Sequence, residues 1–247
     1  MKELEKYLMQ VIENVLNLIY PRRCPICDGV LKYKESKDLI HEDCKKKIKY
    51  VGNNVCMKCG KPMKSGDDAE YCEDCLKIRH RFKRGFSVFN YRSVSGSIYK
   101  FKYLGRKEYA DFYAKVTKQR LGKKLKDLKV DALIPVPMYK DKQYLRGYNQ
   151  AEVYAGKLSK LTGIPLYDDV IVRSRQTRPM KELDLRGRRN NLKKAFNIVR
   201  NDVKFKCILI IDDIYTTGST IDEIAHEFQM AGVENIYFLT LAIGQTT

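Results

Sequence analysis

The chain has 247 residues and a mass of 28.8 kDa, which allows one or two domains and a sizeable buried core. Hydrophobic residues make up 44% and charged residues 32%, so the composition is that of a globular rather than a disordered protein. No apolar run reaches the ~20 residues that span a membrane, and the N-terminus lacks the uninterrupted apolar stretch of a signal peptide. We therefore expect a cytoplasmic protein without membrane insertion.

The net charge of +18 is unevenly distributed along the chain. Residues 77–128 carry 16 Lys/Arg against 3 acids, and residues 173–206 carry 12 against 3. Residues 207–247 contain six acids and no Lys or Arg. This clustering indicates an anionic partner such as a phosphate, a nucleotide or a nucleic acid, and the alternative is a well-solvated surface.

The first predicted element is a packing helix within residues 1–21. Apolar residues recur there at helical spacing from Leu4 to Ile19, and Pro21 ends the pattern. Residues 22–80 follow as a predicted double zinc-ribbon domain, and residues 81–247 as a larger α/β domain.

Seven of the eight cysteines fall within residues 24–75. Cys-x2-Cys pairs in a cytosolic protein more often hold metal than form disulfides, because two thiolates so spaced reach one Zn2+ from a tight turn. Twelve residues separate two of these pairs, which predicts a four-sulfur site with the ligands Cys56, Cys59, Cys72 and Cys75.

A second zinc site needs a fourth ligand beside the remaining three cysteines. His41 precedes Cys44 by three residues, so the predicted set is Cys24, Cys27, His41 and Cys44. The alternative is that His41 is an ordinary exposed histidine and the chain binds one zinc. Four protein ligands leave no open position for substrate, so both sites are predicted to be structural.

Strands alternate with helices after residue 82, which predicts a mainly parallel α/β sheet. The predicted strands are 86–91, 131–136, 165–172, 206–212 and 235–243. The predicted helices are 94–103, 109–121, 149–161 and 219–231. Residues 137–147 are predicted to form a polar loop, and the Arg-rich residues 173–191 a mobile loop.

The sharpest motif, residues 208–220, joins a buried strand to a helix through a Thr/Gly/Ser loop. Asp212 and Asp213 stand at the end of the strand, where α/β sheets bind ligands. Gly218 lets the backbone approach a ligand closely, and free N–H groups at the helix start favour a phosphate. Carboxylates accept hydrogen bonds from a cis-diol, so the combination suits a sugar phosphate. The Walker A and dinucleotide-binding glycine patterns are both missing.

The motif closely resembles the phosphoribosyl pyrophosphate (PRPP) signature of type I phosphoribosyltransferases. Together with the zinc segment, the chain resembles the ComF (ComFC) family, which is linked with natural competence. The stretches that carry the resemblance, beside the paired cysteines and residues 208–220, are Phe101-Lys-Tyr103, Ile134-Pro-Val-Pro137, Arg146-Gly-Tyr-Asn-Gln150, Arg188-x2-Asn191 and Ala195-Phe196. The family usually has a cysteine at the position of His41.

The resemblance implies a type I phosphoribosyltransferase fold, with Mg2+ arriving together with PRPP. It implies that Asp212 and Asp213 hold the ribose hydroxyls and that a pyrophosphate loop follows the strand 131–136. It also implies that the 5′-phosphate is held by Thr216, Thr217, Gly218, Ser219 and Thr220. In the pyrophosphate loop we expect contacts from Met138 and Lys140, with Arg146 as the best catalytic candidate. A solvated loop is the alternative for residues 137–147.

Three functions remain open from the sequence. The first is a PRPP-binding transferase with an unknown acceptor. The second is a DNA-uptake factor that binds single-stranded DNA through the zinc segment and basic stretches and acts with a competence helicase. Its PRPP pocket is then regulatory or also catalytic. Exposed aromatic residues between Phe82 and Tyr103 would stack on bases in that case, although core packing is the better explanation for most of them. The third is a zinc-ribbon scaffold whose sheet has lost its chemistry.

Overall fold

The computed structural model describes residues 21–32, 35, 37–64, 69–174, 195–200 and 204–244. The chain divides into two compact units, residues 1–47 and residues 48–247. The predicted N-terminal helix, apart from Pro21, lies outside the described residues, as does the predicted loop 173–191 beyond its first two residues. No helix in the described ranges has both the length and the apolar character needed to cross a membrane.

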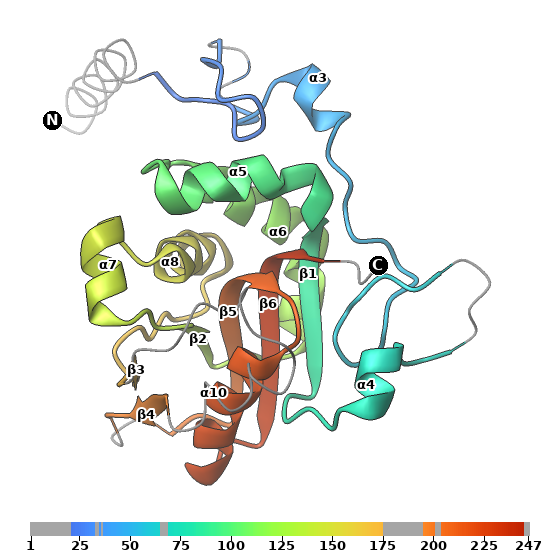
Figure 1. Ribbon diagram of the computed structural model, residues 1–247, viewed down its shortest axis with the longest axis vertical. Helices are drawn as coiled ribbons and strands as arrows, with labels where there is room; N and C mark the ends of the chain where they lie inside the picture. Colours follow the sequence, from blue (N-terminus) through green and yellow to red (C-terminus); the bar gives the residue numbers. More distant parts are fainter. Residues whose placement is uncertain are drawn as a thin grey trace, which may run out of the picture. The chain divides into compact units, whose positions relative to one another are not determined.

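The elements follow one another in the order shown in Figure 1. The strands are β1 (Arg84–Asn90), β2 (Ala132–Pro135), β3 (Ile171–Arg173), β4 (Phe196–Ile198), β5 (Cys207–Tyr215) and β6 (Asn235–Ile243). The helices are α3 (Glu42–Lys45), α4 (Glu73–Lys77), α5 (Tyr91–Tyr103), α6 (Tyr109–Asp127), α7 (Lys140–Arg146), α8 (Gln150–Thr162) and α10 (Ser219–Met230). All of these except α3 belong to the second unit.

Four strands form a wholly parallel sheet in the order β1-β6-β5-β2. The central strands β5 and β6 are almost continuously apolar and buried, as expected for a parallel sheet with helices on both faces. The predicted α/β fold with a mainly parallel sheet is confirmed.

The two faces of the sheet carry different helices. Ile208 and Ile210, two residues apart on β5, share a core with Ile224 and Phe228 of α10. Helices α5, α6 and α8 pack on the opposite face (Figure 1). Successive residues of a strand point to opposite faces, so each side chain on β5 faces either α10 or the other three helices.

The segment that carries the second group of cysteines covers the free edge of β1. The Gly85 N–H donates to the Lys58 carbonyl at 2.8 Å, and the Asn90 N–H donates to the Lys49 carbonyl at 2.8 Å. The Val51 N–H donates to the Val88 carbonyl at 3.0 Å. These bonds satisfy groups that an edge strand otherwise exposes.

Two sequence predictions of local structure were wrong. The predicted strand 165–172 is split: residues 165–167 hydrogen-bond beside β2, and β3 then pairs with β4 in a separate antiparallel sheet. The exposed Asp168 and Asp169 separate the two parts, because aspartate is poorly accommodated in strands. The predicted polar loop 137–147 contains the short helix α7, whose Tyr144 and Leu145 are exposed and give no apolar helical pattern to detect.

Candidate functional site

The first metal cluster lies in the unit of residues 1–47. The ligand atoms of Cys24, Cys27, His41 and Cys44 lie within 4.8 Å of one another. His41 directs Nδ1 toward the Cys27 sulfur at 3.2 Å, while its Nε2 lies 3.1 Å from the Val30 carbonyl oxygen. A backbone carbonyl that accepts from Nε2–H leaves Nδ1 available to a metal, and zinc-binding histidines are commonly oriented in this way.

The second metal cluster belongs to the unit that contains the sheet. Its ligand atoms, from Cys56, Cys59, Cys72 and Cys75, again lie within 4.8 Å of one another. The sulfurs of Cys59 and Cys72 are 3.6 Å apart, and the side chains are largely buried. Sulfur and nitrogen donors in sets of four suit tetrahedral Zn2+, so both predicted ligand sets come together in an arrangement that fits structural zinc.

Asp212 and Asp213 lie near the carboxyl end of β5 and point to opposite faces of the sheet. Asp212 continues the row of Ile208 and Ile210, and it lines a hollow together with residues 214–221 at the start of α10. Asp213 is buried and contacts Lys102 of α5 and Gln150 of α8. The two adjacent carboxylates therefore serve two different surroundings.

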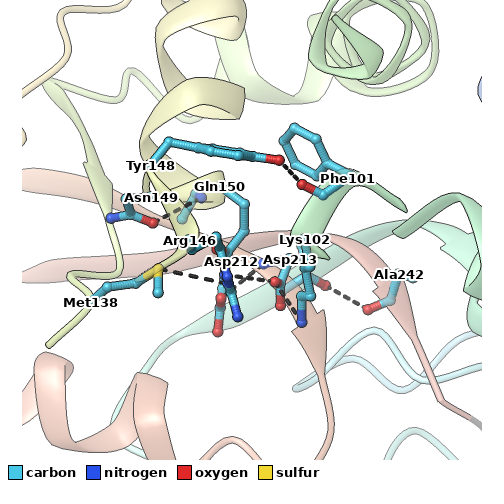
Figure 2. A network of polar contacts seen from close by, with 12 residues as sticks. Phe101, Lys102, Met138, Arg146, Tyr148, Asn149, Gln150, Asp212, Asp213 and Ala242 are labelled. Atoms are coloured by element: carbon cyan, nitrogen blue, oxygen red, sulfur yellow. Dashed lines mark hydrogen bonds and ion pairs between the residues drawn. The ribbon is translucent and has the colours of Figure 1, made fainter. Parts of the chain in front are cut away.

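Asp213 is the centre of a polar network (Figure 2). The Lys102 ammonium, at the end of α5, lies 2.7 Å from Asp213 Oδ2, and the Gln150 amide donates to the same oxygen at 2.8 Å. Burial opposes the positive charge of Lys102, but the Asp213 carboxylate outweighs it and raises the pKa of Lys102. The pair is thus a buried, hydrogen-bonded ion pair.

Arg146 extends this network toward α7. Its guanidinium donates to the Gln150 side-chain oxygen, lies 3.7 Å from the Met138 sulfur and stacks over the Tyr103 ring at 4.9 Å. Gln150 links Arg146 to Asp213, because it accepts from Arg146 and donates to Asp213 (Figure 2). Of the three residues predicted for the pyrophosphate loop, the structure thus joins Arg146 and Met138, whereas Lys140 is exposed at the start of α7.

Asp212 has an unusual protonation equilibrium. Burial and the neighbouring Asp213 charge raise the pKa of Asp212 to about 7, although the Asp213 N–H donates to it at 2.8 Å and Lys102 and Arg173 stabilise its anion. A cation close to such a carboxyl group stabilises its ionised form and lowers its pKa.

The loop between β5 and α10 has a backbone conformation that requires glycine. Thr216 to Thr220 all line the hollow that contains Asp212, and the hydroxyls of Thr217 and Ser219 lie 3.0 Å apart. Gly218 has φ = +77°, and a Cβ there would lie 2.7 Å from the Tyr215 hydroxyl. Only glycine adopts this backbone conformation without strain, so the loop depends on Gly218.

Several residues of this region were missed by the sequence reasoning. Lys102 and Gln150 stand in stretches that carry the family resemblance, but spacing alone assigns them no partner. His80 and Asp222, 142 residues apart in the chain, form a buried pair at 2.7 Å beside Gly218. Only the folded chain brings them together.

Core packing accounts for most of the aromatic residues in the basic stretch. Phe82, Phe86, Phe89 and Phe101 are buried, as the core interpretation predicts. The exposed aromatic residues are Tyr91, Tyr99 and Tyr103.

Comparison with known proteins gives the following similarities. Residues 15–76 match the family model "Double zinc ribbon domain", which agrees with the two clusters described above. Competence protein F of Haemophilus influenzae is 32% identical over 231 residues, which cover 89% of this chain and 96% of that protein.

More distant relatives cover less of the chain. DNA utilization protein YhgH of Salmonella typhi is 30% identical over 70% of this chain and 76% of its own length. Competence protein ComFC of Bacillus subtilis is 26% identical over 72% of each protein. A solved purine phosphoribosyltransferase from Pyrococcus horikoshii Ot3 matches with 18% identity and a TM-score of 0.32, over 55% of this chain and 84% of that chain.

Proposed function

The chain belongs to the competence protein F family, and we propose that it binds PRPP with Mg2+ and transfers the phosphoribosyl group to an acceptor. The observation that carries the proposal is the shared hollow of Asp212 and the loop Thr216–Thr220 at the carboxyl edge of a parallel sheet. Free N–H groups at the N-terminus of a long helix, next to hydroxyls and a carboxylate, suit a phosphate linked to a diol.

The remaining residues of the site suit the diphosphate and the ribose of PRPP. Arg146, fixed by Gln150 and Tyr103, would face the diphosphate as a planar cationic donor. Lys102 pairs with Asp213, and Asp213 would accept hydrogen bonds from the ribose.

Mg2+ prefers oxygen ligands, and the Asp212 carboxyl group in the hollow would supply them. The half-buried Asp212 carboxyl, with its pKa raised to about 7, is the group that a divalent cation would favour in the ionised form. Mg2+ bound with PRPP would neutralise charge on the leaving diphosphate.

In the proposed reaction, the bond between C1 of the ribose and the diphosphate oxygen breaks. A nitrogen of the acceptor forms a new bond to C1 with its lone pair and then loses a proton to solvent. The protein contributes by fixing the sugar and both phosphate groups in one geometry and by stabilising the departing negative charge.

Calorimetric titration with PRPP, with and without Mg2+, tests the proposal. We expect Mg2+-dependent binding by the wild type and a loss of at least tenfold in affinity for Asp212→Asn/Asp213→Asn, since charge-assisted hydrogen bonds contribute about 1.5–3 kcal/mol each. Asp169→Asn is the matched control, because Asp169 pairs with Arg200 at the surface. Absence of binding by a folded wild type would reject the proposal.

The remaining parts of the sequence interpretation stay predictions. These are the binding of single-stranded DNA, a helicase partner, the cytoplasmic location and the domain boundaries at residues 21/22 and 80/81.

A further inference from the structure

His80 lies directly beneath the loop that is proposed to hold the 5′-phosphate. Its side chain is 1% exposed, and Nδ1–H donates to Asp222 Oδ2 at 2.7 Å. A Cβ on Gly218 would lie 3.0 Å from Cε1 of His80, so the imidazole ring and the loop backbone are in contact. Asp222 is joined to the same loop, because its N–H donates to the Gly218 carbonyl at 2.8 Å.

The hydrogen bonding of His80 is incomplete. Nε2 is buried and has no hydrogen-bond partner among the described residues. Packing alone does not account for a buried polar nitrogen without a partner, because such a group loses its hydrogen bonds to water on folding. The contacts of His80 with Asp222 and Gly218 therefore need a reason other than core filling.

The chain around His80 connects α10 to the second metal cluster. The Arg81 N–H donates to Asp222 Oδ1 at 2.9 Å, and the Gln229 amide donates to the Arg81 carbonyl at 2.9 Å. His80 follows Cys75 by five residues, so the segment that leaves the cluster is fixed to α10 at both its first turn and its last.

An aromatic stack forms a second connection between the cluster and the loop. The His80 ring stacks on Phe82 at 4.7 Å, Phe82 packs edge-on against Phe238 at 4.7 Å, and Phe238 stacks on Tyr215 at 4.8 Å. Phe82 and Tyr215 share one buried core with Cys59, and the Tyr215 hydroxyl is the atom closest to Gly218 on its Cβ side. Packed rings transmit displacement because protein interiors leave little free volume.

We propose that His80 is a positioning residue that couples zinc in the second cluster (Cys56, Cys59, Cys72, Cys75) to the phosphate loop. Zinc in this cluster sustains the loop conformation that accepts the 5′-phosphate. The first cluster, in the unit of residues 1–47, takes no part in the contacts described above, so its zinc serves as the comparison. The inference rests on the proposed PRPP site and adds that zinc controls the binding of the 5′-phosphate there.

Two variants of His80 distinguish a positioning role from a purely structural one. His80→Asn places an amide N–H near the position of Nδ1 and keeps the bond to Asp222, whereas His80→Leu removes it. Calorimetry with ribose 5-phosphate should show about tenfold weaker binding for His80→Leu and near wild-type affinity for His80→Asn. Pyrophosphate, which would bind at Arg146, should change less than twofold in both variants.

Two cysteine variants test the role of the metal. Cys72→Ser and Cys24→Ser should each retain one zinc per chain, and only Cys72→Ser should weaken ribose 5-phosphate binding. If Cys72→Ser does not fold, the two His80 variants decide the question. Unchanged ribose 5-phosphate affinity in His80→Leu, or equal weakening in both cysteine variants, would overturn this inference while PRPP binding by the wild type still stands. A wild type that binds no PRPP would overturn the proposed function and this inference with it.

Discussion

At the scale of single residues, neighbouring side chains decide what each aspartate can do. Asp212 and Asp213 are adjacent in sequence, yet strand geometry sends them to opposite faces. Asp213 has a lysine and an amide as partners, whereas Asp212 faces the loop before α10 and has its pKa raised to about 7. The same residue type thus has two different surroundings at adjacent positions of one strand.

The raised pKa of Asp212 predicts that the free energy of unfolding depends on pH. Between pH 4 and 7 the folded state holds a proton that the unfolded state has lost, so this contribution to stability falls as pH rises and is gone above pH 7. Asp212→Asn should flatten this decline and be more stable than the wild type at pH 8, by on the order of 2 kcal/mol. Urea unfolding at pH 5 and pH 8 measures both effects.

Asp169→Asn is the control for this measurement, because Asp169 is a surface residue. Its pH dependence should follow that of the wild type. A pH dependence of Asp212→Asn that also follows the wild type would contradict the assignment of the raised pKa.

At the scale of elements, β1 packs closely enough against β6 to require a glycine. A Cβ on Gly85 would lie 2.0 Å from the ring of Phe238, which is fully buried between Phe82 and Tyr215. The ring of Phe238 shares one buried core with cysteines of the second cluster.

Gly85→Ala is therefore expected to destabilise the protein by about 3 kcal/mol, since extra volume in a packed core forces rings from their preferred positions. The matched control is Gly96→Ala on the exposed face of α5, where an added Cβ meets nothing within 4 Å. That change should stabilise the helix by about 0.5–1 kcal/mol. Thermal unfolding of both variants measures the difference, and shifts in the same direction would refute this account of β1.

At the scale of the whole molecule, the two metal clusters have different relations to the sheet. The first lies in a separate compact unit, and the second shares a buried core with β5 and α10. Loss of one metal should therefore differ in its consequences from loss of the other.

Metal analysis should give two zinc ions per chain for the wild type and one for His41→Ala. Because His41 belongs to the first unit, the main thermal transition of residues 48–247 should stay within about 2 °C of the wild-type value. Cys207→Ala, which changes the one cysteine outside both clusters, should retain two zinc ions. A wild-type content of one zinc would remove the first site.

The sequence by itself determined the features that depend on local pattern. The spacing of the cysteines gives both ligand sets, and the alternation of apolar runs gives the parallel α/β sheet. The motif 208–220 places two acids and a phosphate-type loop together, because a buried strand followed by a glycine loop and a helix leaves few other arrangements.

Only the tertiary structure decided the contacts between residues far apart in the chain. Lys102 meets Asp213, and His80 meets Asp222, through the packing of helices on the two faces of the sheet. The tertiary structure also assigned the two clusters to different units, since nothing in the cysteine spacing shows which cluster shares a core with the sheet. Such pairings follow from the burial of whole surfaces, and local periodicity does not show which surfaces pack together.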